Sequence, residues 1–127
     1  MIINTPISLG ELVDKISILM IKKKNIIDKV KLKYVEKELE ALNLTLHQSV
    51  QDNSIDDYLK KLINVNSELW KVEDDIRECE RNKIFDNKFI ELARSVYFTN
   101  DKRAKLKEEI NIKFESQIVE VKSYKEY

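Results

Sequence analysis

The sequence has almost nothing that would interrupt a helix. Of its 127 residues one is glycine and one is proline, and both, Gly10 and Pro6, lie within the first ten positions. These two residue types disfavour a helix interior most strongly. The sequence therefore predicts one mainly α domain that spans residues 1–127. Having a single glycine, it also excludes a glycine-rich phosphate loop and the glycine-flanked turn of a serine hydrolase.

The sequence also lacks an excess of either charge, because 23 basic and 23 acidic residues give zero net charge. Nonspecific binding to the phosphate backbone of nucleic acids needs a basic excess, so no such binding is expected. No apolar stretch approaches the roughly 18 residues of a membrane helix, and the N-terminus lacks the order of a secretion signal. We therefore expect no membrane insertion and a cytoplasmic location. The only cysteine, Cys79, excludes an internal disulfide and is expected to be a buried, inert thiol.

Apolar residues recur at helical spacing along most of the chain, and capping residues divide them into about five helices. Ser8, with Glu11 three residues on, forms a capping box that begins the first helix. From Leu32 to Val50 apolar residues follow in steps of three and four, which is coiled-coil spacing. A break near residues 28–31 would make the first two helices a long hairpin.

Three further helices are expected in the second half of the chain. Ser54 caps a third helix that runs to about Asn82, and Asp86 caps a shorter fourth helix. A run of three capping residues, Thr99–Asp101, predicts the start of a fifth helix.

Both ends of the chain are expected to be short strands. Residues 1–7 read as an extended arm, and the period changes from helical to alternating in residues 117–124. Two isolated strands would be marginally stable, so we expect them to pair against helices or across a dimer. A homodimer is also favoured by the coiled-coil spacing of the second helix and by the third helix, which is lined on two faces.

All four arginines lie in one region, between the only tryptophan, Trp70, and the start of the expected fifth helix. Guanidinium groups suit carboxylate or phosphate ligands. At about 100° per residue, Trp70, Asp74, Arg77 and Arg81 share one face of the third helix, roughly opposite its apolar stripe. This face either binds a ligand or belongs to a network of salt bridges, since Glu73 and Asp74 can both pair with Arg77.

The following helices extend this region. Arg94 and Tyr97 lie on the fourth helix, and Asn100 and Arg103 begin the fifth, whose free backbone amides would suit an anion. The candidate ligand-binding residues are Trp70, Asp74, Arg77, Arg94, Tyr97, Asn100 and Arg103. No cofactor is predicted.

An enzymatic alternative rests on paired carboxylates. Glu11 and Asp14 stand three residues apart on the first helix, and Asp75 and Glu78 do so on the third, so two helices could hold Mg²⁺. The all-α nucleotide pyrophosphohydrolases are similar in this spacing. His47 has no neighbouring nucleophile or orienting partner and is expected to be a surface residue.

Four blocks of the chain are distinctive: residues 8–15 (SLGELVDK), 69–77 (LWKVEDDIR), 89–97 (FIELARSVY) and 119–124 (VEVKSY). In these blocks the chain resembles a small bacterial and phage helical family, a domain of unknown function, over most of its length except residues 31–53. The resemblance implies no catalytic role for any residue. Because members occur joined to or near glycosyltransferase modules, it implies an association with glycan biosynthesis.

Three functions therefore stay open. The leading one is a noncatalytic module that binds an anionic small molecule or an acidic segment of a protein partner. The second is Mg²⁺-dependent hydrolysis of a nucleotide at the four paired carboxylates. The third is a structural homodimeric adaptor, in which the arginine region is a salt-bridge network.

Overall fold

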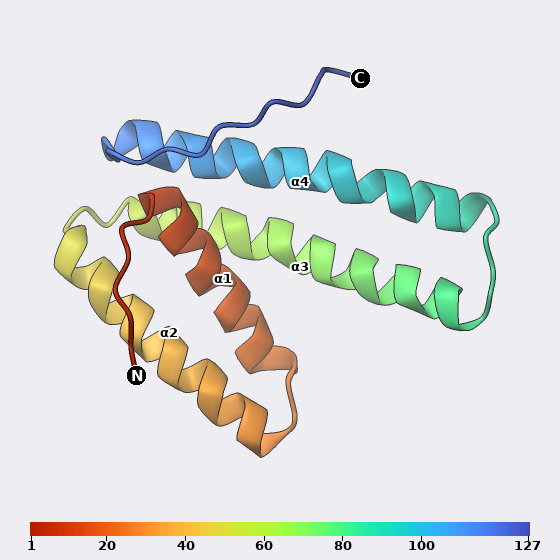
Figure 1. The fold of residues 1–127 in the computed structure, drawn as a ribbon, viewed down its shortest axis with the longest axis horizontal. Helices are drawn as coiled ribbons and strands as arrows, with labels where there is room; N and C mark the ends of the chain where they lie inside the picture. Colours follow the sequence, from red (N-terminus) through yellow and green to blue (C-terminus); the bar gives the residue numbers. More distant parts are fainter.

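The computed structural model describes all 127 residues and contains four α-helices (Figure 1). Their bounds are α1 Leu9–Asn25, α2 Lys29–Ser49, α3 Ile55–Arg81 and α4 Asn87–Lys113. The mainly α class is therefore confirmed, and the expected break near residues 28–31 falls at the α1–α2 connection. The predictions of five helices and of terminal strands are wrong.

Two of the predicted helix starts have the expected capping geometry. The backbone N–H of Glu11 donates to Ser8 Oγ at 3.1 Å, and that of Phe89 donates to Asp86 Oδ1 at 3.2 Å. The start of α3 differs, because the Ser54 side chain makes no capping hydrogen bond and its buried Oγ has no partner. Asp52 instead turns the chain here by accepting a hydrogen bond from the Ser54 N–H at 2.9 Å.

The expected fourth and fifth helices are one continuous helix, α4. The capping residues Thr99–Asp101, which predicted a new start, lie in its interior. No glycine or proline stops the helix at this point, and Thr99 is buried against the rest of the protein. Propagation of an existing helix is easier than ending and nucleating again, so tertiary packing overrides the local capping signal.

The helices form a hairpin of α3 and α4, against which α1 packs at one end (Figure 1). α1 contacts all three other helices, whereas α2 packs on α1 alone among the helices. Fully buried Val13, Ile16, Leu62 and Ile110 show that the core lies where α1 meets α3 and α4. None of the four helices combines the length and apolar character that crossing a membrane requires.

The coiled-coil spacing of α2 is used inside the chain. Its Val35, Leu39 and Leu46 are buried in the same core cluster as Leu12 and Ile16 of α1. The apolar stripe that favoured a dimer through α2 is therefore already covered by the chain itself.

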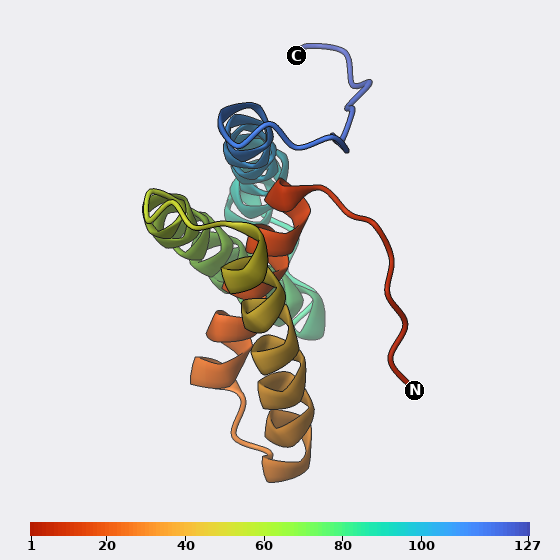
Figure 2. The same cartoon turned by 90° about the vertical axis from the view of Figure 1, so that its left-hand side faces the viewer.

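The half of the α3–α4 hairpin nearest its connecting loop has neither α1 nor α2 beside it (Figure 1). We call this the distal half, and the half packed on α1 the proximal half. The two chain ends are extended but unpaired, and Figure 2 shows the N-terminal arm running away from the C-terminal tail. A strand needs a neighbouring backbone for its hydrogen bonds, and neither end has one.

Candidate functional site

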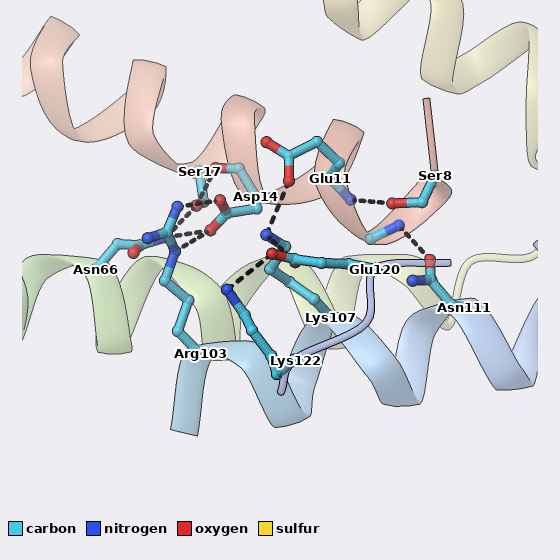
Figure 3. Close-up of polar contacts among 11 residues, drawn as sticks. Ser8, Glu11, Asp14, Ser17, Asn66, Arg103, Lys107, Asn111, Glu120 and Lys122 are labelled. Carbon is cyan, nitrogen blue, oxygen red and sulfur yellow. Dashed lines mark hydrogen bonds and ion pairs between the residues drawn. The ribbon is translucent and has the colours of Figure 1, made fainter. Parts of the chain in front are cut away.

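Charged and polar residues fill the contact between α1 and α4 (Figure 3). The two helices approach so closely that a Cβ on Gly10 would lie 2.5 Å from the backbone oxygen of Lys107. The Gly10 N–H, one of the free donors at the start of α1, donates to Asn111 Oδ1 at 2.7 Å. This contact, the α1–α4 seam, therefore depends on the chain's only glycine.

Asp14 is the centre of the seam and is fully buried. Arg103 donates to both of its carboxylate oxygens, through Nε to Oδ1 at 2.9 Å and through Nη2 to Oδ2. Asn66 of α3 donates to Asp14 Oδ1 at 2.9 Å and to Ser17 Oγ at 2.8 Å. The buried charge is thus neutralised and hydrogen-bonded from two helices, as burial of a carboxylate requires. The bond to Asp14 also raises the pKa of Arg103.

A second ion-pair chain ties the C-terminal tail to the seam. Lys107 Nζ lies 2.8 Å from Glu11 and 2.9 Å from Glu120, and Lys122 Nζ lies 2.8 Å from Glu120. Burial lowers the pKa of Lys107, but its bonds to Glu11 and Glu120 outweigh this effect and raise the pKa. Lys122 and Lys107 lower the pKa of Glu120 to about 2. The tail is therefore held by side chains rather than by a strand ladder.

Beside Arg103 lies an open groove of about 480 Å³ where α1 ends against α3 and α4. We call it the Trp70 groove. Its lining residues are Ile18, Ile21, Asn66, Leu69, Trp70, Glu73, Asp74, Arg77, Asn100 and Arg103.

The groove brings together five of the seven predicted ligand-binding residues: Trp70, Asp74, Arg77, Asn100 and Arg103. The other two lie elsewhere on α4. Arg94 Cζ lies 5.8 Å from the centre of the Phe98 ring, and the centres of the Tyr97 and Tyr127 rings are 5.4 Å apart. Arg94 therefore does not line the groove that contains Arg77, although both residues were predicted to belong to one ligand-binding site.

The charges in the groove are largely matched within the chain. The fork of Arg103 is occupied by Asp14, and Arg77 Nε lies 3.5 Å from Glu73 with both side chains mostly exposed. Asp74 makes no ion pair, so the open part of the groove holds at least as much negative as positive charge. Asn100 lies inside α4, so the expected helix N-terminus with free amides does not exist here.

The four carboxylates of the enzymatic alternative do not gather in one place. Glu11 and Asp14 are bound to Lys107 and Arg103 in the seam. Asp75 pairs with Lys71 at 2.7 Å, and Glu78 pairs with Arg81 on the same helix. No group of three or more histidine, cysteine, aspartate or glutamate side chains is positioned to hold a metal ion.

Two residues for which no functional role was predicted, His47 and Cys79, lie where they were expected. His47 is exposed near the end of α2, and Cys79 is a buried free thiol.

Sequence reasoning missed the residues that hydrogen-bond around Asp14, join Gly10 to α4 and hold the tail, namely Ser17, Asn66, Lys107, Asn111 and Glu120. One signal for them existed: Asp14 and Ser17 interrupt the apolar run of α1 on its buried side. A polar residue at a core position predicts a buried partner, although it does not say which residue that partner is.

A match to a family of unknown function covers nearly the full chain. The sequence profile described as Family of unknown function (DUF6165) matches residues 3–127. The chain belongs to this family. The match includes residues 31–53, which the resemblance in the sequence had left out. No curated protein and no solved structure matches the chain.

Proposed function

We propose that this DUF6165 protein is a noncatalytic structural adaptor that forms a homodimer through the distal half of its α3–α4 hairpin. The observation that carries the proposal is the apolar surface left uncovered there. Phe85 is 54% and Ile90 52% exposed, and Ile84 beside them is also exposed. An apolar patch of this kind on a helical hairpin is typical of a protein contact.

The side of α4 that lines the Trp70 groove continues toward this apolar surface, with the ring of Tyr97 partly covered by that of Tyr127. On α4, Tyr97, Ala93 and Ile90 precede Asn100 at intervals of three and four residues, so they extend its side of the helix toward the loop. On α3, Arg77 lies seven residues beyond Trp70 on the same side. We call this combined surface the distal face.

The charges of the distal face favour a second copy as its partner. Glu73 and Asp74 carry negative charge beside Arg77. The long contact between Glu73 and Arg77 is the one ion pair among these three residues, and Asp74 has no ion-pair partner. In a two-fold dimer the same surface of both chains forms the contact. An acidic group on this surface can therefore pair with a basic group on the same surface of the other chain. Two copies would therefore pair Asp74 with the Arg77 of the other chain.

A small anion is a poorer occupant of the Trp70 groove. It would find one partly free guanidinium, that of Arg77, together with the carboxylates of Glu73 and Asp74. Like charges at short range disfavour a phosphate there. The adaptor reading needs no free arginine, and for this reason we prefer it.

The test is the mass of the protein in solution, measured by light scattering between about 1 and 100 μM, a range that covers typical specific dimers. The wild type is expected to have twice the 15.1 kDa mass of one chain. Replacing Ile90 by Glu places a charge in the centre of the contact and is expected to give monomers. The matched control is Leu44→Glu on α2, which is also exposed and should leave the dimer intact.

A charge exchange refines the test. Asp74→Arg or Arg77→Asp alone should weaken the dimer, and the double variant should recover it because the pair is restored in the opposite sense. A wild type that stays at 15.1 kDa at every concentration contradicts the proposal. So does a dimer that Leu44→Glu disrupts and Ile90→Glu does not.

A further inference from the structure

A second groove, of about 460 Å³, lies between α3 and α4, and its charges are nearly all of one sign. Three lysines, Lys61, Lys102 and Lys105, line it together with a single carboxylate, Glu109. We call it the lysine groove. It shares no residue with the Trp70 groove.

None of the three lysines takes part in an ion pair. The eight ion pairs of the protein use other lysines and three of the four arginines, although the chain has as many acidic as basic residues. A chain with zero net charge thus carries a local excess of two positive charges in this groove. Such a local excess of positive charge attracts anions more strongly than isolated surface lysines do.

The groove also offers apolar contacts. Val65 and Leu106 are its two apolar lining residues. The Lys61 ammonium lies 5.3 Å from the centre of the Tyr58 ring, which restricts where this charge can move. An anion bound by the lysines would therefore have an apolar surface next to it.

We infer that the lysine groove binds a small organic phosphate that carries two or more negative charges. Lysine ammonium groups bind phosphate as point charges, and several of them around one groove favour a multiply charged group over a single carboxylate. Val65 and Leu106 receive the organic part of the ligand. This inference does not depend on the homodimer. Lys102 and Lys105 are about 140° or more around α4 from Asn100, the α4 residue that lines the Trp70 groove.

The experiment is a titration of the isotope-labelled full chain, followed by NMR signals of its backbone and lysine side chains. Inorganic phosphate, pyrophosphate and phenyl phosphate are the three probes. Pyrophosphate is expected to bind more tightly than phosphate because of its charge, and phenyl phosphate more tightly than phosphate because of its ring. The shifted signals should be those of Lys61, Lys102 and Lys105, and binding should saturate.

Variants separate this site from a general charge effect. Lys102→Gln together with Lys105→Gln should weaken pyrophosphate binding by roughly tenfold or more, as expected for the loss of charge-assisted hydrogen bonds. The control, Lys23→Gln with Lys24→Gln on α1, removes the same charge from exposed positions and should have little effect. An equal loss in the control, binding without saturation, or shifts centred on Arg77 and Arg103 would each overturn the inference. None of these three results bears on the dimer, which is measured by mass.

Discussion

The two halves of the α3–α4 hairpin use the same charged residues in opposite ways. In the proximal half two ion pairs join α1 to α4: Asp14 with Arg103 and Glu11 with Lys107, which are 89 and 96 residues apart in the chain. In the distal half each ion pair joins residues three or four apart, such as Lys71 with Asp75 and Glu80 with Lys83. A pair between helices fixes their arrangement, whereas a local pair supports only one helical turn. The ion pairs of the proximal half therefore fix how the helices are arranged, whereas those of the distal half do not.

This comparison predicts the largest stability loss at Asp14. Asp14→Asn keeps the shape of the side chain but leaves Arg103 without its counter-charge. Loss of one partner of a buried pair costs about 3 to 5 kcal/mol, and because the Arg103 side chain is 29% exposed we expect the lower end of that range. The free energy of unfolding, from urea denaturation at one fixed protein concentration, measures the effect. A loss no larger than that of an exposed ion pair would remove the distinction between the halves.

The next largest effect is expected at Gly10. Gly10→Ala would place a methyl group 2.5 Å from the Lys107 backbone oxygen, which cannot move without shifting α4. Overpacking of this kind costs roughly 1 to 3 kcal/mol, and the better helix propensity of alanine offsets only part of it. Ser67→Ala on the exposed side of α3 is the control and should change the free energy of unfolding by less than about 0.5 kcal/mol. Equal stability of the two variants would show that the helices do not approach this closely.

A smaller effect is expected where the tail meets the seam. Lys122 and Lys107 lower the pKa of Glu120 from 4.5 to about 2, so the folded state favours the carboxylate. Its contribution to stability is complete above the unfolded pKa and disappears as the pH falls from about 4.5 to about 2. The Glu120 side chain is 38% exposed, so solvent screens its ion pairs. Glu120→Gln is therefore expected to lower the free energy of unfolding by about 1 kcal/mol or less. A carboxyl NMR titration of Glu120 with a midpoint near 4.5 would contradict the contact.

The smallest effect is expected in the distal half. Asp75→Asn makes the same chemical change as Asp14→Asn but at an exposed local pair, since the Lys71 and Asp75 side chains are 76% and 37% exposed. Such pairs contribute about 0.3 to 0.5 kcal/mol. The same urea measurement should therefore place this variant close to the wild type. A loss as large as that of Asp14→Asn would mean that the distal half is also held by its charges.

Local signals predicted the fold better than the site. The Ser8 and Asp86 caps are determined by residues three positions away, so the sequence alone identifies them. Thr99–Asp101 carried the same kind of signal and was misleading, because burial of Thr99 and the absence of a helix breaker kept α4 continuous. The role of Arg103 could not be read at all, since its partner Asp14 lies 89 residues earlier. Two of the four clustered arginines line the Trp70 groove. That Arg103 is bound to a carboxylate of the chain itself depends on how α1 packs, which the sequence does not show.

The long separation between α1 and its partners also has a consequence for the order of folding. α1 is synthesised before the other three helices, and α2 can pack on it as soon as residues 29–49 are made. Its polar side, however, lacks its charged partners until Arg103 and Lys107 of α4 follow. Contacts between such distant segments form late, because a long loop must be closed before they stabilise anything. α1 is thus made before α2, α3 and α4, but its buried carboxylate is neutralised only when Arg103 of α4 packs on it.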